Sequence, residues 1–249
     1  MSSKPERLEG IHAIINLAGE SINQRWTEDA KERIIKSRLV AAERISKLVR
    51  TLQRKPDVVI NASGISAYGN SETATFDEDS PVVVSDFLSS VVEKWEIAAD
   101  SIGAKRMVKL RVGIVIGTEG GAFPKMALPY RMFAGGKIGS GKQWLSWIHV
   151  EDIVRLIAFC IDHDEIHGPV NASAPEPVTN DDFGRAIAGA MGRPHWMPVP
   201  GAMLKLIFGE LSVLLLEGQR VLPRRALDAG FKFRFPTVQS AMKDLVGAK

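Results

Sequence analysis

The stretch AIINLAG at residues 13–19 decides the fold that we expect for this chain. It is a short apolar run that ends in glycine, as in a strand buried on both faces of a parallel sheet. A second run of the same kind, VVINASG, follows at residues 58–64. Between the two runs, residues 27–52 place apolar side chains at helical spacing, which predicts a long amphipathic helix. A strand, a helix and a strand in this order predict a parallel βαβ unit.

The same alternation continues along the chain. Thr27 is the expected N-cap of the first long helix, since Glu28 and Asp29 follow it in the first turn. Thr179, with Asp182 three residues later, resembles a capping box. The pattern predicts two more strands, at residues 108–116 and 169–172, and three more helices, at residues 86–102, 150–161 and 179–192.

These elements predict an α/β fold, in which a Rossmann-type parallel sheet carries helices on both faces and a smaller C-terminal lobe lies on the substrate side. We assign residues 1–117 and 148–172 to a partial Rossmann domain. We assign residues 118–147 and 173–249 to the lobe. Residues 118–146 are rich in glycine and proline, which predicts an irregular excursion around a site.

Composition limits the partners that we expect. The 249 residues carry a formal net charge of only +3 and no basic stripe, so we expect no nucleic-acid partner. The most apolar stretch, residues 203–222, contains four charged residues, and the N-terminus lacks the apolar centre of a signal peptide. We therefore expect no membrane partner. A single cysteine, Cys160, fits a reducing compartment such as the cytoplasm.

Several short strings together resemble one family closely. The chain is similar to the epimerase-like branch of atypical extended short-chain dehydrogenases/reductases, also described as nucleoside-diphosphate-sugar epimerase-like. The resemblance covers nearly the whole chain, including the characteristic C-terminal domain. The strings that carry it are NLAGE (16–20), RW (25–26), KSR (36–38), AYG (67–69), KWE (94–96), RVGIVIG (111–117), GKIGSG (136–141), WIHVED (147–152), LLEGQRVLP (215–223) and GFKFRFP (230–236).

This resemblance implies a fold that binds NADP. Leu17, Ala18 and Gly19 would then lie against the cofactor at the end of their strand. Arg38 would face the cofactor from the following helix, and the backbone at Val115 would border the nicotinamide. The activity implied is that of an oxidoreductase or an epimerase, hence an isomerase, which acts on a small carbonyl, hydroxyl or sugar-like substrate by hydride transfer.

The chain departs from the wider superfamily at its start. Such proteins open with a strand, a Gly-x-x-Gly-x-x-Gly turn and a helix whose N-terminus holds the pyrophosphate. Before Ala13 there are only a dozen residues, most of them polar. We therefore expect that this N-terminal half is lacking, and that residues 13–18 form an apolar sheet edge open to pairing, for example in a homo-oligomer.

The second departure concerns catalysis. Extended members usually carry Ser, Tyr and Lys as proton-transfer groups, but Gly64, Leu88 and Val92 stand at the corresponding positions here. Tyr68, with Ser63, is the candidate substitute for acid–base chemistry, because both lie at the end of the second strand. Alternatively, Tyr68 is an ordinary packed aromatic. The protein would then be a non-catalytic one that binds a dinucleotide or a partner.

Two residues are candidates for substrate contact. Lys142 ends the string GKIGSGK at residues 136–142, which matches the spacing of a phosphate loop. Gln143 follows it in place of the Ser or Thr that holds magnesium, so we expect a glycine-rich substrate-side loop and no nucleotide triphosphatase. His149 either contacts substrate or caps the helix that follows it. No spacing predicts a metal site.

Overall fold

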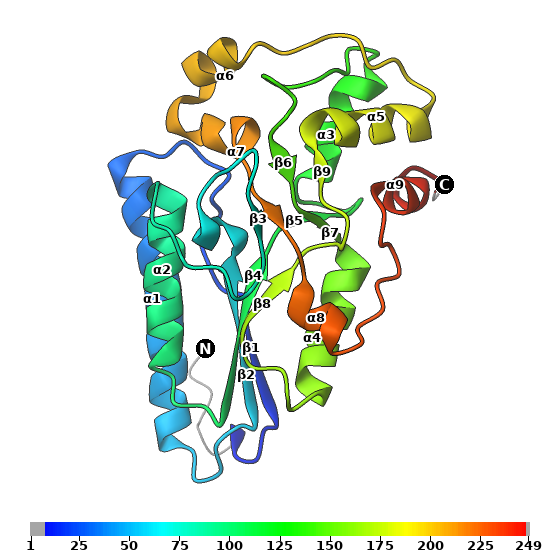
Figure 1. Ribbon diagram of the computed structural model, residues 1–249. Helices are drawn as coiled ribbons and strands as arrows, with labels where there is room; N and C mark the ends of the chain where they lie inside the picture. Colours follow the sequence, from blue (N-terminus) through cyan, green and yellow to red (C-terminus); the bar gives the residue numbers. More distant parts are fainter. Residues whose placement is uncertain (1–7, 248–249) are drawn as a thin grey trace.

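The computed structural model describes residues 8–247 and has a parallel sheet at its centre (Figure 1). Its strand order is β1-β2-β4-β8, and every neighbouring pair is parallel. The register sets Asn16 opposite Asn61, and Gly64 opposite Val112. This confirms the predicted α/β fold with a Rossmann-type sheet. The strands are β1 (Ala13–Asn16), β2 (Val58–Gly64), β4 (Arg106–Val112) and β8 (Gly168–Ala172).

Helices cover both faces of this sheet. Figure 1 shows α1 (Glu28–Thr51) and α2 (Phe87–Asp100) on one side, and α4 (Val150–Asp162) and α8 (Arg224–Asp228) on the other. Val59 packs with buried residues of α1 and α2, whereas its neighbours Val58 and Ile60 pack with buried residues of α4. Alternate side chains of β2 therefore pack into two separate hydrophobic cores, one on each face of the sheet.

The helix ends follow the predicted capping. The Thr27 side chain accepts a hydrogen bond from the Ala30 N–H at the start of α1. Thr179 accepts one from the Asp182 N–H at the start of α5 (Asn180–Met191), and that helix ends at Gly192 in the left-handed conformation. These contacts use backbone donors that a helix N-terminus leaves without an internal partner.

The predicted strand at residues 108–116 is divided at Gly113 into β4 and β5 (Ile114–Ile116). Whereas β4 pairs with β8, β5 pairs in parallel with β7 (Trp147–His149). A Cβ atom at Gly113 would lie 2.5 Å from the Ser146 carbonyl oxygen. A glycine is therefore required where the strand changes its partner.

Residues 118–146 are more regular than we expected. They contain α3 (Phe123–Arg131), which has Pro124 in its first turn and Pro129 in its interior, and β6 (Trp144–Leu145). Proline is tolerated in the first helical turn, so a proline-rich stretch does not exclude a helix. β6 pairs antiparallel with β9 (Val178–Thr179), which joins this segment to the C-terminal part of the chain.

The lobe lies beyond the carboxyl ends of the strands (Figure 1). It contains α3, α5 and most of the elements that follow α5, whereas α8 lies against the sheet. The assignment of residues 118–147 and 173–249 to the lobe stays a prediction. Within the second range, α8 and Phe231 pack in the same core as β2, β4 and β8. The later elements are α6 (Gly201–Phe208), the 3-10 helix η3 (Gly209–Ser212), α7 (Val213–Leu216), β10 (Arg220–Val221) and α9 (Val238–Gly247).

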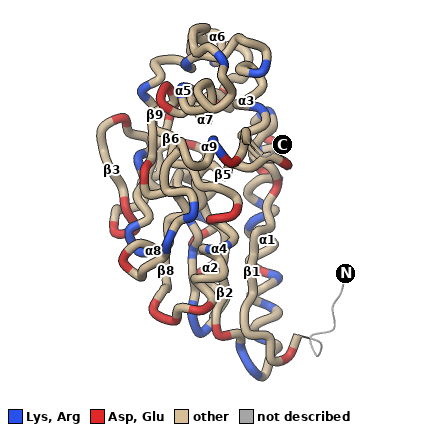
Figure 2. The backbone as a smooth tube through the Cα atoms, turned by 90° about the vertical axis from the view of Figure 1, so that its right-hand side faces the viewer, with Lys and Arg blue, Asp and Glu red and all other residues tan. Residues whose placement is uncertain are grey.

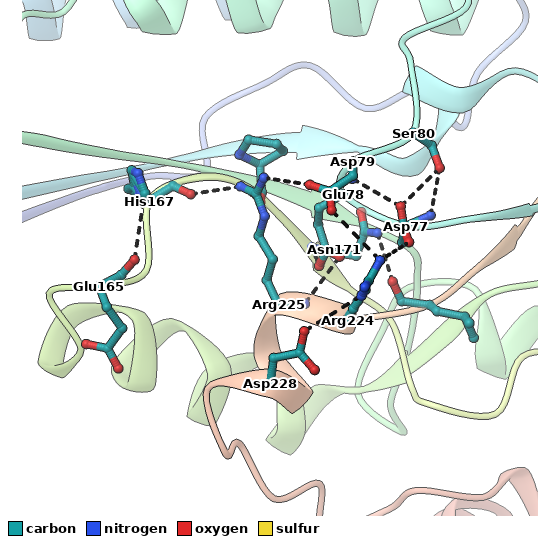
Figure 3. Close-up of polar contacts among 12 residues, drawn as sticks. Asp77, Glu78, Asp79, Ser80, Glu165, His167, Asn171, Arg224, Arg225 and Asp228 are labelled. Carbon is teal, nitrogen blue, oxygen red and sulfur yellow. Dashed lines mark hydrogen bonds and ion pairs between the residues drawn. The ribbon is translucent and has the colours of Figure 1, made fainter.

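A cluster of ion pairs fastens this tail to the sheet (Figure 3). β10 pairs with β3 (Thr75–Phe76), and the loop after β3 carries Asp77, Glu78 and Asp79. Arg224 donates to Asp77 at 3.1 Å, and Arg225 donates to Asp79 at 3.2 Å. Arg225 also donates to the backbone carbonyls of residues 167 and 169, directly before and within β8. We call Asp77, Glu78, Asp79, Arg224 and Arg225 the tail cluster.

β1 is at one edge of the four-stranded sheet, and within residues 8–247 it pairs only with β2. Ile15 and Leu17 expose large parts of their side chains there. Pairing with a second chain through this edge stays a prediction. In this part of the chain, no helix combines the length and the apolar character needed to cross a bilayer.

Candidate functional site

The site begins at the end of β1, where the backbone is open. Leu17, Ala18 and Gly19 are all exposed, and Leu17 exposes 59% of its surface. The preceding residue, Asn16, is buried and donates a hydrogen bond of 2.6 Å to the side chain of Asn61 on β2. The side-chain oxygen of Asn16 accepts the Ala18 N–H at 3.2 Å. An asparagine pair therefore holds the ends of β1 and β2 together and sets the direction of the exposed turn.

Arg38 lies beside this turn, and its contact with a cofactor stays a prediction. A Cβ atom at Gly19 would be 3.0 Å from the Arg38 guanidinium carbon, so the two groups are in close contact. The Arg38 guanidinium carbon also lies 4.8 Å from the ring centre of Trp95. One nitrogen donates to the carbonyls of Glu20 and Ile34. Burial lowers the pKa of Arg38, but an arginine stays charged. The turn thus has a positioned cation beside an exposed backbone.

The ends of β2 and β4 are closed by a buried ion pair that the sequence did not predict. Arg111 on β4 donates two hydrogen bonds, of 2.8 and 2.9 Å, to the carboxylate of Glu96 on α2. The Ser63 hydroxyl donates to the same carboxylate at 2.7 Å. Burial raises the pKa of Glu96, but the bonds and charge of Arg111 outweigh it, so the net pKa lies below the usual value. Ser63 is therefore engaged with a charged carboxylate.

Tyr68 belongs to the same buried region. It lies in the 3-10 helix η2 (Ile65–Tyr68) directly after β2, and only 2% of its surface is exposed. Its hydroxyl donates to the side-chain oxygen of Asn171 on β8 at 2.7 Å, and the Arg111 guanidinium lies 4.8 Å from its ring centre. Burial raises the pKa of Tyr68, so its phenol holds the proton at neutral pH.

Asn171 connects this region to the tail cluster. Its side chain donates to the Leu222 carbonyl at 3.0 Å, and its backbone N–H donates to the Glu78 carboxylate at 2.9 Å. Figure 3 shows Glu78 and Asn171 beside the two arginines of α8. We call Ser63, Tyr68, Glu96, Arg111 and Asn171 the buried polar chain. Sequence patterns did not reveal it, although Glu96 lies four and eight residues after Val92 and Leu88, on the buried face of α2, where a charge needs a partner.

The positions where the superfamily keeps Tyr and Lys are apolar and packed. Leu88 and Val92 are buried on α2, and a Cβ atom at Gly64 would lie 3.3 Å from a Val92 methyl group. A proton-transfer side chain is therefore absent from this contact. Arg111 retains one buried nitrogen, Nη1, without a hydrogen-bond partner among the described residues. A buried donor of this kind normally binds water or a ligand.

Val115, His149 and Lys142 differ from one another in burial and in their contacts. Val115 is half-buried on β5, just past the strand break at Gly113. His149 is 2% exposed; its ring packs on Phe235, and it accepts the Glu151 N–H as the N-cap of α4. Lys142 is exposed on the glycine-rich loop. Substrate contact by His149 or Lys142 stays a prediction.

The glycine-rich loop uses its own backbone donors. The Ile138 N–H donates to Asn180, the Gly139 N–H to Val199, and the Gly141 N–H to Ile138. These three N–H groups are therefore engaged within the protein and do not point toward a phosphate cradle.

A broad hollow of about 780 Å³ lies at the opposite end of the sheet, near the amino ends of the strands. Several of its charges are paired; for example, Asp57 contacts Lys105 at 2.6 Å and His12 at 2.7 Å. In sheets of this kind ligands bind at the carboxyl ends of the strands. We therefore place the candidate site at the other end, around Leu17, Arg38 and Val115.

Comparison with known proteins agrees with this geometry. The profile of the NAD dependent epimerase/dehydratase family matches residues 4–172. The chain belongs to this family. A second profile, described as a domain of unknown function (DUF1731), matches residues 199–245. The chain therefore has the architecture that the resemblance implied, with an epimerase-like part followed by a C-terminal domain.

Relatives of this epimerase/dehydratase member cover nearly all of it. "Epimerase family protein YfhF" of Bacillus subtilis is 43% identical over 243 residues, which are 97% of this chain and 80% of that protein. The mouse "Epimerase family protein SDR39U1" is 40% identical over 94% of this chain and 81% of its own length. The crystal structure of human SDR39U1 (isoform 2) with NADPH has a TM-score of 0.91 at 36% identity, covering 98% of this chain and 86% of that one.

Proposed function

We propose that the chain binds NADP(H) at the carboxyl ends of β1, β2 and β4, and acts as an NADP-dependent oxidoreductase or epimerase on a small carbonyl, hydroxyl or sugar-like substrate. The observation that carries the proposal is the exposed turn at residues 17–19 with Arg38 in contact with Gly19. The human relative crystallised with NADPH supports the same ligand.

The residues present fit such a cofactor. The backbone at Leu17, Ala18 and Gly19 allows close approach, because two of these residues have small side chains or none. Arg38 supplies a fixed positive charge for a phosphate, and Val115 would border the nicotinamide. The unpaired nitrogen of Arg111 is a further donor at the strand ends. When bound, NADP(H) accepts or supplies a hydride.

Acid–base chemistry in this proposal depends on Tyr68 and Ser63. Tyr68 holds a proton at neutral pH, as a general acid must, and Ser63 is adjacent on β2. Both hydroxyls, however, donate to buried partners, Asn171 and Glu96. This arrangement, together with Leu88 and Val92, favours a second candidate function: a protein that binds the dinucleotide without catalysis.

Calorimetry with NADPH tests the binding proposal. We expect saturable binding to the chain, and Arg38→Gln should weaken it about tenfold or more, because a charge-assisted contact is lost. Lys36→Gln is the matched control, since Lys36 is exposed on the same helix. Absence of binding, or equal loss in both variants, would overturn the proposal.

Turnover separates the two candidate functions. NADPH oxidation is followed across a panel of small carbonyl compounds and nucleotide sugars, with the unmodified chain and with Tyr68→Phe and Ser63→Ala. Turnover that both substitutions reduce supports catalysis through this pair. Binding with no turnover on any compound supports the non-catalytic function.

A further inference from the structure

The tip of the lobe exposes a group of large apolar side chains. Trp196 exposes 65% of its surface and Leu206 exposes 87%. We call the whole group the lobe tip; its other members are Met132, Phe133, Met203 and Ile207, each at least 46% exposed. Scattered apolar residues are ordinary on protein surfaces, but a contiguous group marks a site of interaction.

Contacts between two segments bring Phe133 and Trp196 together, and α6 begins a few residues after Trp196. The Trp196 indole N–H donates to the Phe133 carbonyl at 2.9 Å, and the Arg193 guanidinium lies 4.2 Å from the Phe133 ring centre. The backbone N–H groups of Trp196 and Met197 both donate to the Gly135 carbonyl. The chain then passes directly into α6. Figure 1 shows this loop and α6 at the far end of the lobe. Trp196 is thus held in place by its polar atoms while its ring faces outward.

α6 is apolar on more than one face. Leu204 is buried toward the lobe, whereas Met203, Leu206 and Ile207 face solvent. Their spacing of three and four residues places these three on a shared stripe. A helix that is apolar on both sides is expected to be covered on both sides. The lobe itself covers only one.

The charges around the lobe tip have a single sign. Residues 123–142 and 192–209 contain six Lys or Arg and no Asp or Glu. The neighbouring carboxylates are paired: Glu210 contacts Lys31 at 2.8 Å, and Asp181 contacts both His195 and Arg185 at 2.9 Å. Figure 2 shows Lys and Arg positions around α6 at this end of the molecule.

We propose that the lobe tip docks on an anionic lipid surface. Tryptophan and aliphatic side chains would enter the interface, and Arg131, Arg193 and Lys205 would lie at the level of the acidic headgroups. Apolar side chains that project beside unpaired cations are the combination such a surface requires. We expected no membrane partner from the sequence, because no segment could span a bilayer; docking at the surface requires no span. The proposal does not depend on the proposed function.

Vesicle sedimentation and fluorescence test it. The chain is mixed with vesicles of phosphatidylcholine and phosphatidylglycerol in equal amounts, and with vesicles of phosphatidylcholine alone. We expect sedimentation with the first and little with the second, and a loss of binding as salt is raised. Of the five tryptophans only Trp196 is exposed, so its emission should shift to shorter wavelength on binding. Trp196→Phe should remove that shift.

Substitutions at exposed positions identify the surface. Leu206→Ala should lower the partition coefficient about tenfold, and Lys205→Gln about fivefold. Val154→Ala on α4 and Lys94→Gln on α2 are matched controls, because both residues are exposed on helices that flank the sheet, away from α6 (Figure 1). They should leave binding unchanged.

Three results would overturn the proposal. The first is sedimentation that does not differ between the two vesicle types. The second is binding that Leu206→Ala and Lys205→Gln leave intact. The third is a dimer in analytical ultracentrifugation that Leu206→Glu dissociates, since a second copy of the chain would then cover the lobe tip.

Discussion

The two ends of neighbouring strands in this sheet are built in opposite ways. At the end of β1 the turn Leu17–Gly19 is exposed, and one arginine lies over it. At the ends of β2 and β4, Ser63, Glu96 and Arg111 are buried and bonded to one another. The end of β1 presents exposed backbone and a positive charge to a ligand. At the ends of β2 and β4, most polar side chains are hydrogen-bonded to one another. Substitutions at the end of β1 should therefore change ligand affinity, and substitutions at the ends of β2 and β4 should change stability.

The largest effect is expected at the closed end. Glu96→Ala leaves Arg111 buried without its carboxylate, which should lower the free energy of unfolding by about 3–5 kcal/mol. Urea unfolding measures it. Glu93→Ala is the control, because Glu93 is exposed on the same helix and its loss should change stability by less than about 0.5 kcal/mol. Similar values for both variants would mean that the buried pair contributes little.

Tyr68→Phe should have a smaller effect on stability. It removes the hydrogen bond to Asn171 and leaves the Asn171 oxygen without its donor, at a cost of about 1–2 kcal/mol in the free energy of unfolding. NADPH affinity should be unchanged, since the open end is untouched. A cycle with Asn171→Ala isolates the pair, and an absence of coupling would contradict the contact.

Two buried carboxyls should respond to pH with opposite signs. The pKa of Glu96 is lowered from its usual 4.5, so the stability it contributes is present above pH 4.5 and is lost as the pH falls through its folded value. Burial raises the pKa of Glu78 from the same 4.5, against the N–H bonds it accepts from Asn171 and Arg225. Its contribution is therefore present below pH 4.5 and is lost as the pH rises through its folded value.

Unfolding across a pH series separates these two contributions. Glu96→Gln should flatten the decline in stability on the acid side, and Glu78→Gln should flatten a decline on the side above pH 4.5. If both variants changed the dependence of unfolding free energy on pH in the same direction, the pairing of Glu96 with Arg111 would not explain a difference between Glu96 and Glu78.

The smallest effect on stability is expected at the open end. Gly19→Ala places a methyl group 3.0 Å from the flexible Arg38 guanidinium, which can move aside, so stability should change by about 0.5 kcal/mol or less. NADPH affinity should nevertheless fall, because Arg38 is displaced. Gly120→Ala, where nothing lies within 4 Å, is the control for both measurements. A stable variant with full affinity would remove Arg38 from the proposed site.

Local signals in the sequence predicted the sheet well. Apolar runs that end in glycine marked β1 and β2, and Thr27 and Thr179 marked two helix starts through bonds that span only three residues. The break at Gly113 was missed, because it depends on Ser146, which comes close only in the folded chain. α3 was missed because its two prolines resemble loop composition.

The candidate site divides in the same way. Only the family resemblance pointed to Arg38, and its contact with the turn at Gly19 closes the loop between β1 and α1. The bond between Tyr68 and Asn171 joins positions 103 residues apart, and that between Asn171 and Glu78 joins positions 93 apart. The spacing of residues within one segment cannot predict these hydrogen bonds, because they depend on the order of the strands in the sheet.

The tail cluster also bears on the order in which the chain assembles. Its ion pairs join Asp77 and Arg224, which are 147 positions apart. During synthesis, β1, β2 and β4 leave the ribosome before Arg224 does, so these strands can pair while Asp77 and Asp79 still lack these partners. Closing so large a loop is slow compared with forming local helices. We expect docking of α8 to be a late event in folding, which completes a sheet that has already formed.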